Sequence, residues 1–339
     1  MKIVVLAGGW SPEREVSLLS GRMVANALLG GGHRVLLLDL GEGIETLPTD
    51  CEELFRADEP YEERILSFQQ PNAEALSEMW KSRRMIGPNV LKLCAMADKV
   101  FLALHGSVGE NGMLQAALDL HGISYTGSDA VGSMIAMDKD LSKRLLRDAG
   151  IPTPVWMLFD PAHTSQAALK ARVGFPCVIK PSCCGSSVGI SMVNEESELD
   201  AALVEAQRWG CPILAERRII GRELTVGILN GKPLPTVEIR PKQGFYDYKN
   251  KYNGETEEIC PAEISSTINA RAVAFSLRGF DALHLRGYAR FDFLLDHTEG
   301  LWCLEANTLP GMTPSSLFPR AAEAAGISYG ELCERILRI

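Results

Sequence analysis

The stretch RFDFLLDHTEGLWCLEANTLPGM, which begins at Arg290 and ends at Met312, decides the fold of the C-terminal part of the chain. It predicts two strands joined by the polar turn HTEG, whose residues are typical of a hairpin. Side chains alternate between the two faces of a strand, so Arg290 and Asp292 share one face. Glu305 and Asn307 likewise share one face of the second strand, and the hairpin is predicted to have one polar face.

The other face of this hairpin is predicted to pack into a core. On the first strand it carries Phe291, Phe293 and Leu295, and on the second strand Leu304 and Ala306. Apolar residues at every second position are typical of a strand buried on one side.

The polar face is a candidate metal site. Asp292, Glu305 and Asn307 offer two carboxylates and an amide oxygen, which are ligands that Mg²⁺ accepts together with water and phosphate oxygens. A half-buried hairpin with a solvated polar face would explain Asp292 alone. It explains less well why a carboxylate and an amide are aligned beside Arg290, so the pattern favours the metal site.

Length and composition limit the kind of protein. A chain of 339 residues is too long for one ordinary core and predicts two or three domains. The contents of 46% hydrophobic and 23% charged residues are those of a globular protein. No apolar run reaches the roughly 18 residues of a membrane span. A strand follows Met1 directly, so the sequence predicts no secretory signal and a cytoplasmic location.

Cysteines and charge exclude further classes. The nine cysteines include no CxxC and no metal-type spacing, which predicts free thiols in a reducing compartment. The net charge of −9 argues against nucleic acid as a partner. Any phosphate must therefore be held by a local cluster of cations.

The beginning of the chain predicts a strand, a helix and a second strand of an open parallel sheet, from KIVVLA through the helix-periodic residues after Ser11 to HRVLLLDL. Glu13 lies where the first strand passes to the helix. It is a candidate ligand residue, but the local sequence favours the simpler explanation of an acid placed by the helix dipole.

A second strand end carries a histidine. The buried strand Val100–Leu104 runs into His105 and a glycine-rich loop, GSVGENG, and ligands of open sheets bind at such strand ends. A satisfied, partly buried histidine is the alternative. Lys139 follows in a helix predicted from Asp138 to Gly150, where by itself it would be an exposed lysine.

The segment VIKPSCCGSSVGIS is a candidate phosphate-binding loop. Its glycines and serines suit phosphate oxygens, and Lys180 adds charge at the base of the loop. It is not a P-loop, because GxxxxGK[ST] is absent and no helix follows. A flexible hairpin is the alternative. Glu216 and Glu223 flank a later break at Gly221, and a long polar segment after Pro241, with Lys251 and Tyr252, is typical of a lid.

Seven motifs, taken together in this order, resemble the D-alanine:D-alanine ligase family of ATP-grasp enzymes. They are GGWSPEREVSLLSG, LHGSVGENG, AMDK, VIKPSCCGSSVGIS, FYDYKNKY, RFDF and LEANTLPGMTPSSL. The resemblance extends from Ile3 to about Leu337, and only residues 41–98 are loosely related. It implies a three-domain ATP-grasp fold of mixed α/β and α+β class, in which an open parallel α/β domain precedes two domains that sandwich ATP. The implied domains are 1–126, 127–220 and 221–339, the last with a lid loop at 243–258.

The resemblance also implies roles for the nucleotide site. The ligands of Mg²⁺, for two ions with Mn²⁺ as a substitute, are Asp292, Glu305 and Asn307. The phosphate-binding residues are Lys139, Lys180, Lys251, Ser186 and Ser187. The residues that contact adenine and ribose are Glu216, Ile219 and Glu223.

Further implied roles concern the amino-acid substrates. Glu13 holds the ammonium of the first D-alanine, with His105 beside it. Ser186 and Tyr252 form a hydrogen-bonded trio with Glu13 that ties the lid to the site. Arg290 and the Gly311 amide are oxyanion donors, and the second substrate binds at Ser315, Ser316 and Leu317.

The implied reaction is ATP-dependent ligation of two D-alanines through an acyl phosphate, for peptidoglycan precursor synthesis, by a homodimer. Ligation of D-alanine to D-lactate or D-serine is the alternative. Lys251, Tyr252 and Leu317 favour D-alanine. A non-catalytic nucleotide-binding regulator is the other alternative, and it is less consistent with the sequence because a regulator need not retain Arg290, Glu305 and Asn307 together.

Three departures from the family pattern stand out. Asn111 replaces an aspartate of the glycine-rich loop, Cys183 and Cys184 replace polar residues of the phosphate loop, and Arg217-Arg218 replace a charged and an aromatic residue near adenine. The two cysteines predict sensitivity of the phosphate loop to oxidation.

Overall fold

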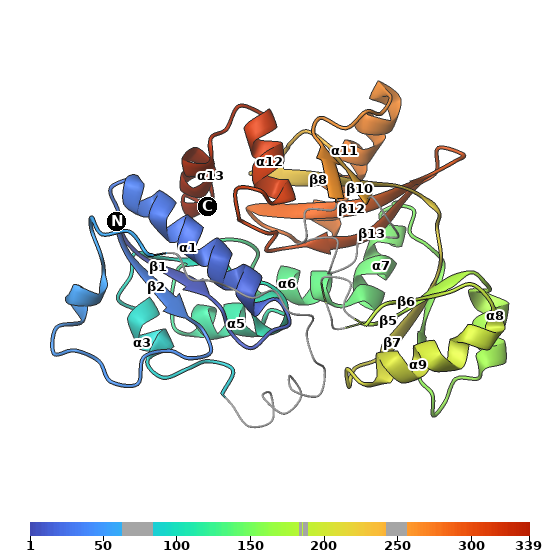
Figure 1. Ribbon diagram of the computed structural model, residues 1–339, viewed down its shortest axis with the longest axis horizontal. Coiled ribbons are helices and arrows are strands. Elements are labelled where there is room, and N and C mark those ends of the chain that lie inside the picture. The colour runs from blue at the N-terminus through green and yellow to red at the C-terminus, as the bar shows by residue number, and fades with distance from the viewer. Residues whose placement is uncertain (63–83, 183–184, 186–188, 242–255) are drawn as a thin grey trace.

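The computed structural model describes residues 1–62, 84–182, 185, 189–241 and 256–339. Within these residues the strands form three sheets, one parallel and two antiparallel. The parallel sheet lies toward the N-terminus, and the two antiparallel sheets follow along the chain (Figure 1). This order agrees with the predicted mixture of α/β and α+β structure.

The N-terminal sheet has the order β2-β1-β3, with all pairings parallel. Its strands are β1 (Lys2–Ala7), β2 (Arg34–Asp39) and β3 (Lys99–Leu102), and α1 (Arg14–Gly30) connects the first two. The predicted strand, helix and strand are confirmed. The remaining elements are η1 (Cys51–Leu54), α3 (Val90–Cys94), α4 (Ser107–Glu110) and α5 (Met113–Leu120).

Two helices lead into the central sheet, α6 (Ala130–Met137) and α7 (Lys139–Asp148). That sheet is antiparallel with the order β4-β7-β5-β6. Its elements are β4 (Trp156–Phe159), α8 (Gln166–Arg172), β5 (Cys177–Pro181), β6 (Ser191–Val193), η2 (Glu196–Glu198), α9 (Leu199–Gln207) and β7 (Ile213–Arg217).

The third sheet has the order β11-β10-β8-β12-β13, with β9 paired to β8. Its strands are β8 (Gly221–Leu229), β9 (Lys232–Pro233), β10 (Val237–Pro241), β11 (Thr256–Ile259), β12 (Tyr288–Asp296) and β13 (Leu301–Asn307). The helix α11 (Ser266–Ala282) packs on it, and α12 (Leu317–Ala324) and α13 (Tyr329–Leu337) complete the chain.

The predicted hairpin is confirmed as β12 and β13, but one of its core predictions is wrong. The register shifts between Asp292 and Phe293, so that Asp292 faces Glu305 whereas Phe293 faces Cys303. Leu304 is the extra residue of this bulge. It lines a cavity beside the sheet, and Cys303 takes the core position instead. Phe291, Phe293, Leu295 and Ala306 are buried as predicted.

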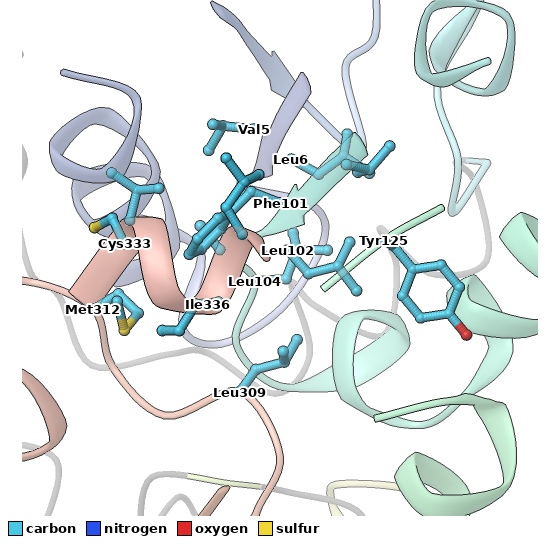
Figure 2. Packing of buried hydrophobic residues seen from close by; sticks show 14 of the residues in the cluster. Val5, Leu6, Phe101, Leu102, Leu104, Tyr125, Leu309, Met312, Cys333 and Ile336 are labelled. Carbon is cyan, nitrogen blue, oxygen red and sulfur yellow. The ribbon is translucent and has the colours of Figure 1, made fainter. Parts of the chain in front are cut away.

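Both ends of the chain share one hydrophobic core. Figure 2 shows Val5 and Phe101 of the parallel sheet beside Cys333 and Ile336 of α13. In Figure 1, α13 correspondingly lies next to α1. Leu309, on the connection after β13, belongs to the same core, so that connection is anchored to the N-terminal sheet.

Two further expectations can be compared with the described residues. None of their helices is long and apolar enough to cross a membrane. The described free thiols are Cys51, Cys94, Cys177, Cys260, Cys303 and Cys333. Cys211 is disulfide-bonded, so the expectation of free thiols is wrong there, because spacing along the sequence does not show which sulfurs the fold brings together.

Candidate active site

The four polar residues of the β12–β13 hairpin lie on one face as directly opposed pairs. Arg290 is paired with Asn307, and Asp292 with Glu305. The Arg290 guanidinium donates from Nε and Nη2 to the two oxygens of Asp292, at 2.9 Å each. Asn307 Nδ2 also donates to Asp292, at 2.9 Å. The sheet thus gathers two carboxylates and an amide on one surface.

This donor set fits a hard divalent cation. Side-chain oxygens of Asp292, Glu305 and Asn307 are the type of ligand that Mg²⁺ accepts, with water or phosphate completing the shell. Among the described residues, no three His, Cys, Asp or Glu side chains group as a metal cluster. Two carboxylates alone are a sparse set, which suits an ion that shares ligands with a phosphate.

A lysine from α7 reaches the same surface. Asp138 caps this helix by accepting hydrogen bonds from the amides of Asp140 and Leu141, at 3.0 Å each. The cap fixes the start of the helix at Lys139. Lys139 is buried, and its Nζ lies 3.1 Å from Glu305 Oε2. The prediction that Lys139 faces the site is therefore consistent with the structure, and an exposed lysine is excluded.

A cavity of about 570 Å³ lies between the central and C-terminal sheets. The predicted nucleotide residues Lys180, Glu216, Ile219 and Glu223 all line it. Lys180 Nζ donates to Glu216 Oε1 at 2.5 Å. The hairpin contributes Leu294 and Leu304 to its wall.

Glu216 is buried between two ammonium groups. Lys143 lies 2.9 Å from Glu216 Oε2 and also donates to Thr153 Oγ1 at 2.7 Å. Burial by itself would raise the pKa of Glu216, but Lys143 and Lys180 together lower it to about 2. The cavity therefore holds a fixed negative charge with two cations beside it.

A second, smaller cavity of about 140 Å³ lies along the hairpin from the first, at the end away from the turn, where it is lined by Arg290, Glu305 and Asn307. The predicted substrate and oxyanion residues that line it are Glu13, His105, Arg290, Gly311, Ser315, Ser316 and Leu317. Glu305 and Asn307 also line it, so the candidate metal ligands border this cavity. Residues distant in the sequence thus converge on one small space.

His105 is held by protein groups on both ring nitrogens. Nδ1 lies 3.0 Å from the Leu309 carbonyl oxygen, and Nε2 lies 3.3 Å from Ser20 Oγ. This pairing identifies Nδ1 as the protonated nitrogen, since a carbonyl oxygen can only accept. Burial lowers the pKa of His105, which favours the neutral ring. His105 therefore forms a wall of the cavity beside Glu13.

Gly311 and Ser316 are in close contact at the other end of the cavity. A Cβ atom on Gly311 would lie 2.9 Å from Ser316 Oγ, so a side chain there would displace one of them. Ser316 Oγ also accepts a hydrogen bond from the Thr313 amide at 3.2 Å. Ser316 immediately precedes α12, which begins at Leu317. The turn places the Gly311 backbone next to the N-terminus of this helix.

Family models match nearly the whole chain. The D-ala D-ala ligase N-terminus model matches residues 2–128, and the D-ala D-ala ligase C-terminus model matches residues 145–338. The chain belongs to the D-alanine:D-alanine ligase family. The predicted family, ATP-grasp fold class and ligase class are therefore confirmed.

Individual relatives of the D-alanine:D-alanine ligase family agree. The D-alanine–D-alanine ligase of Pediococcus pentosaceus is 40% identical, over 99% of this chain and 97% of the relative. That of a Synechococcus strain is 40% identical, over 100% and 93%. A crystal structure of the Bacillus anthracis enzyme complexed with ATP has a TM-score of 0.75 and 30% identity, and the match covers 100% of this chain and 96% of that one.

Several predicted residues of this ligase lie outside the described part of the chain. They are Ser186, Ser187, Lys251 and Tyr252, together with Cys183, Cys184 and most of the lid loop 243–258. Their roles stay predictions. The last three residues of that loop, from Thr256, belong to β11, and Glu258 lines the smaller cavity.

Sequence reasoning missed three residues of the ligase site. Glu110 and Glu258 line the smaller cavity, and Lys143 contacts Glu216. Lys143 is four residues after Lys139, so helical spacing could have placed both on one face. Glu110 lies within the glycine-rich motif that was already recognised. No pattern in the sequence pointed to Glu258.

Two departures from the family pattern have a structural explanation. Asn111 Oδ1 accepts from the Met113 amide at 3.1 Å at the start of α5, which an aspartate could do equally. Arg218 Nη1 donates to Asn194 Oδ1 at 2.9 Å, and Arg217 Nε donates to the Val173 carbonyl at 3.2 Å. Both arginines line the larger cavity, where they extend its wall.

Proposed function

We propose that this ligase joins two D-alanine molecules to D-alanyl-D-alanine at the cost of one ATP, through an acyl phosphate. One observation carries the proposal: the β12–β13 hairpin lines both cavities, with Leu294 and Leu304 on the larger and Arg290, Glu305 and Asn307 on the smaller. A nucleotide in the first cavity and an amino acid in the second would therefore meet at this hairpin.

Magnesium is proposed as the metal, with Asp292, Glu305 and Asn307 as its protein ligands and Mn²⁺ as a substitute. When bound, it supplies positive charge that neutralises the phosphate oxygens of ATP. Two ions are proposed because the resemblance to the family implies them, and phosphate oxygens would supply further ligands.

The proposed phosphate contacts come from Lys139 and Lys180. Both are buried and paired with carboxylates, Lys139 with Glu305 and Lys180 with Glu216. Phosphate oxygens would replace these partners, and the ammonium groups would then stabilise negative charge on the γ-phosphoryl group. The carboxylate of the first D-alanine attacks that phosphorus, ADP leaves, and the acyl phosphate forms.

The first D-alanine is proposed to bind with its ammonium at Glu13. Glu13 is buried, and its Oε2 lies against both Gly106 and Gly185, where an added Cβ would come within 2.9 Å. Glycine at these positions leaves room around the carboxylate. Glu216, Ile219 and Glu223 are proposed to contact adenine and ribose in the larger cavity.

The second D-alanine is proposed to bind at Ser315, Ser316 and Leu317. These residues stand at the start of α12, and a helix N-terminus favours an anion such as its carboxylate. Its amine attacks the acyl phosphate, and the tetrahedral oxyanion develops beside Arg290 and the Gly311 amide. Each such donor is worth roughly 3–4 kcal/mol. Inorganic phosphate then leaves.

Ser186, Ser187, Lys251 and Tyr252 are proposed to complete the phosphate site and to close the lid 243–258 over it. Closure would exclude water, which otherwise hydrolyses an acyl phosphate. The domain limits 1–126, 127–220 and 221–339 are retained as a proposal. Because the reaction consumes ATP for a peptidoglycan precursor, we place it in the cytoplasm.

A homodimer is proposed, because apolar side chains are exposed on neighbouring helices. Leu120 of α5 is 87% exposed, and Met113 of α5 and Val131 and Met134 of α6 are also exposed. Apolar groups gathered on a surface are typical of interfaces. Light scattering coupled to size-exclusion chromatography should give twice the chain mass, whereas a monomer at micromolar concentration would contradict this assembly.

The choice of second substrate is tested by competition. Products are separated by mass from reactions that contain D-alanine with ATP and Mg²⁺, without or with equimolar D-lactate or D-serine. We expect D-alanyl-D-alanine to remain the main product at neutral pH. A depsipeptide with D-lactate, or a mixed dipeptide with D-serine, as the main product would refute the proposed specificity.

A further inference from the structure

The connection from Leu309 to Gly311 leaves the C-terminal sheet and is held by the N-terminal part of the molecule. The Leu309 side chain is 3% exposed and belongs to the core formed around the parallel sheet. Figure 2 shows Leu309 below Leu102 and Leu104, and Met312 near Cys333 of α13, all in the same core. The segment that carries the proposed oxyanion amide is thus docked on a different sheet from the hairpin that it follows.

The backbone of Leu309 is held by two side chains of one short loop. Its amide donates to Glu110 Oε1 at 3.3 Å, and its carbonyl accepts from His105 Nδ1 at 3.0 Å. His105 and Glu110 are five residues apart, at the start and the end of the turn that contains α4. The backbone N–H and C=O groups of Leu309 are therefore both hydrogen-bonded to side chains of the same loop.

Glu110 is itself fixed within that loop. Its second oxygen, Oε2, accepts from the Gly106 amide at 2.5 Å. Gly106 has φ 66°, which lies in the region that favours glycine, so the loop is shaped to present this amide. One carboxylate thereby joins the Gly106 amide to the Leu309 amide, and its two oxygens are both used by the backbone.

We propose that Glu110 is a positioning residue of the ligase, which holds the Leu309 amide and thereby places the Gly311 amide against the reacting carbonyl group. This rests on the proposed role of Gly311 as an oxyanion donor. Gly311 is only two residues from Leu309 and is confined at its other side by Ser316. Movement of Leu309 would be passed on to the Gly311 amide, and a displacement of about 1 Å can reduce a rate by roughly a hundredfold.

The alternative is that Glu110 binds substrate, because it lines the smaller cavity together with Glu13. A substrate ligand and a positioning residue differ in what their loss changes. Loss of a ligand raises the KM for D-alanine, whereas loss of positioning lowers kcat at the step in which the oxyanion forms.

The test compares Glu110→Asp, Glu110→Gln and the control Asp296→Asn in the full chain. Asp keeps the charge but shortens the side chain, and Gln keeps the length but only one acceptor oxygen. Asp296 similarly accepts from two backbone amides, those of Thr298 and Gly300, at 2.8 Å each in the hairpin turn. Steady-state kinetics, positional isotope exchange of γ-¹⁸O-labelled ATP and amide hydrogen exchange are measured for each.

We expect Glu110→Asp to lower kcat for dipeptide formation by about tenfold to a hundredfold. Glu110→Gln should show a smaller loss, and the KM for D-alanine should stay within about twofold of wild type. Isotope exchange, which reports acyl phosphate formation, should be nearly unchanged, and exchange of the Leu309 amide should become faster. Asp296→Asn should match wild type throughout.

Three results would overturn the proposal. They are wild-type kcat in Glu110→Asp, an increased KM for D-alanine with unchanged kcat, or a parallel loss of isotope exchange and dipeptide formation. If Glu110→Asp does not fold, the folded Gln variant decides through protection of the Leu309 amide, and unchanged protection there overturns the proposal. A wild-type protein without dipeptide formation would instead refute the proposed function.

Discussion

Single residues of the site show how its charges are balanced. Three proposed site cations in the described part of the chain face carboxylates: Arg290 faces Asp292, Lys139 faces Glu305, and Lys180 faces Glu216. Buried charges without partners would be costly, so these pairs keep the site stable without ligand. When metal and phosphate bind, the carboxylates of these ion pairs would bind the metal, and the cations would bind the phosphate oxygens instead.

The metal assignment predicts the effect of Glu305→Gln. We expect turnover to fall at least about a hundredfold, because the site loses a charged ligand, while the fold is retained. ADP release with D-alanine and Mg²⁺ measures the effect. Glu299→Gln is the matched control, since Glu299 is exposed in the turn of the same hairpin and should not affect turnover. Normal activity of Glu305→Gln would refute the assignment.

Glu110 predicts a pH effect on stability. Burial, with repulsion from Glu13, raises the pKa of Glu110 from its ordinary value of 4.5 to about 7. The folded protein therefore binds this proton more tightly than the unfolded chain, and stability falls as pH rises from about 4.5 to about 7. In Glu110→Gln the side chain does not titrate, so this decrease in the unfolding free energy with rising pH is absent. Its unfolding free energy relative to wild type should be higher near pH 8 than near pH 5, by at most a few kcal/mol.

Chemical denaturation at the two pH values measures this difference. Asp296→Asn is the control, because hydrogen bonds, first from Trp302 and Thr298, lower the pKa of Asp296, so that it stays charged throughout that window. Its difference from wild type should not change with pH. A Glu110→Gln difference that is equally constant would show that Glu110 titrates normally in the folded protein.

Some of these residues could be predicted from the sequence and others could not. The shared face of Arg290, Asp292, Glu305 and Asn307 follows from strand periodicity alone. Glu110 accepts hydrogen bonds from the backbone amides of Gly106 and Leu309. These two residues are 203 positions apart in the sequence, so no local sequence pattern encodes the contact. Recognition of the motif marked the loop but not the role of this carboxylate.

At the level of elements, α7 presents two buried lysines, Lys139 to Glu305 of the hairpin and Lys143 to Glu216 in the wall of the larger cavity. Lys143 lies one turn after Lys139 and is fully buried against Glu216 and Thr153. Lys143→Met would leave Glu216 with a single counterion. We expect the KM for ATP to rise roughly tenfold and the unfolding free energy to fall by about 3–5 kcal/mol.

ATP titrations of turnover and thermal unfolding measure these effects. Arg144→Met on the same helix is the matched control, because the Arg144 side chain is 61% exposed and pairs with Asp140 across one turn. It should change neither quantity appreciably. A Lys143→Met protein with unchanged KM and stability would contradict the role assigned to the buried lysine.

The turn before α12 predicts a second effect. In Gly311→Ala the new methyl group would meet Ser316 Oγ at 2.9 Å, so the turn must shift. We expect kcat to fall by about tenfold to a hundredfold, with little change in the KM for ATP. Gly330→Ala is the control, because an added Cβ at Gly330 meets no heavy atom of the described residues within 4 Å. Wild-type kcat in Gly311→Ala would show that this turn tolerates displacement.

Most elements were predictable, and the exceptions have physical causes. Apolar periodicity identified β1, α1, β2 and the β12–β13 hairpin. It missed the register shift after Asp292, where β12 pairs with β13 on one side and with β8 on the other, and where Leu304 lines the nucleotide cavity. Bulges depend on pairing across strands, so a single strand sequence does not reveal them.

At the scale of the whole molecule, the two ends of the chain close the site together. The C-terminal helices α12 and α13 pack into the core of the N-terminal sheet, and the Leu309–Gly311 connection crosses with them. Sequence order alone separated these segments into first and last domains. The contact depends on tertiary packing, and the resemblance to a family, not periodicity, is what predicted that Glu13 and Ser316 share a site.

The most direct test of the proposed reaction is its stoichiometry. The purified protein is incubated with D-alanine, ATP and Mg²⁺, and D-alanyl-D-alanine, ADP and phosphate are quantified together. We expect one dipeptide, one ADP and one phosphate per turnover, all abolished when Mg²⁺ is chelated and none formed from L-alanine. ATP hydrolysis without dipeptide, or equal activity with L-alanine, would contradict the proposed function.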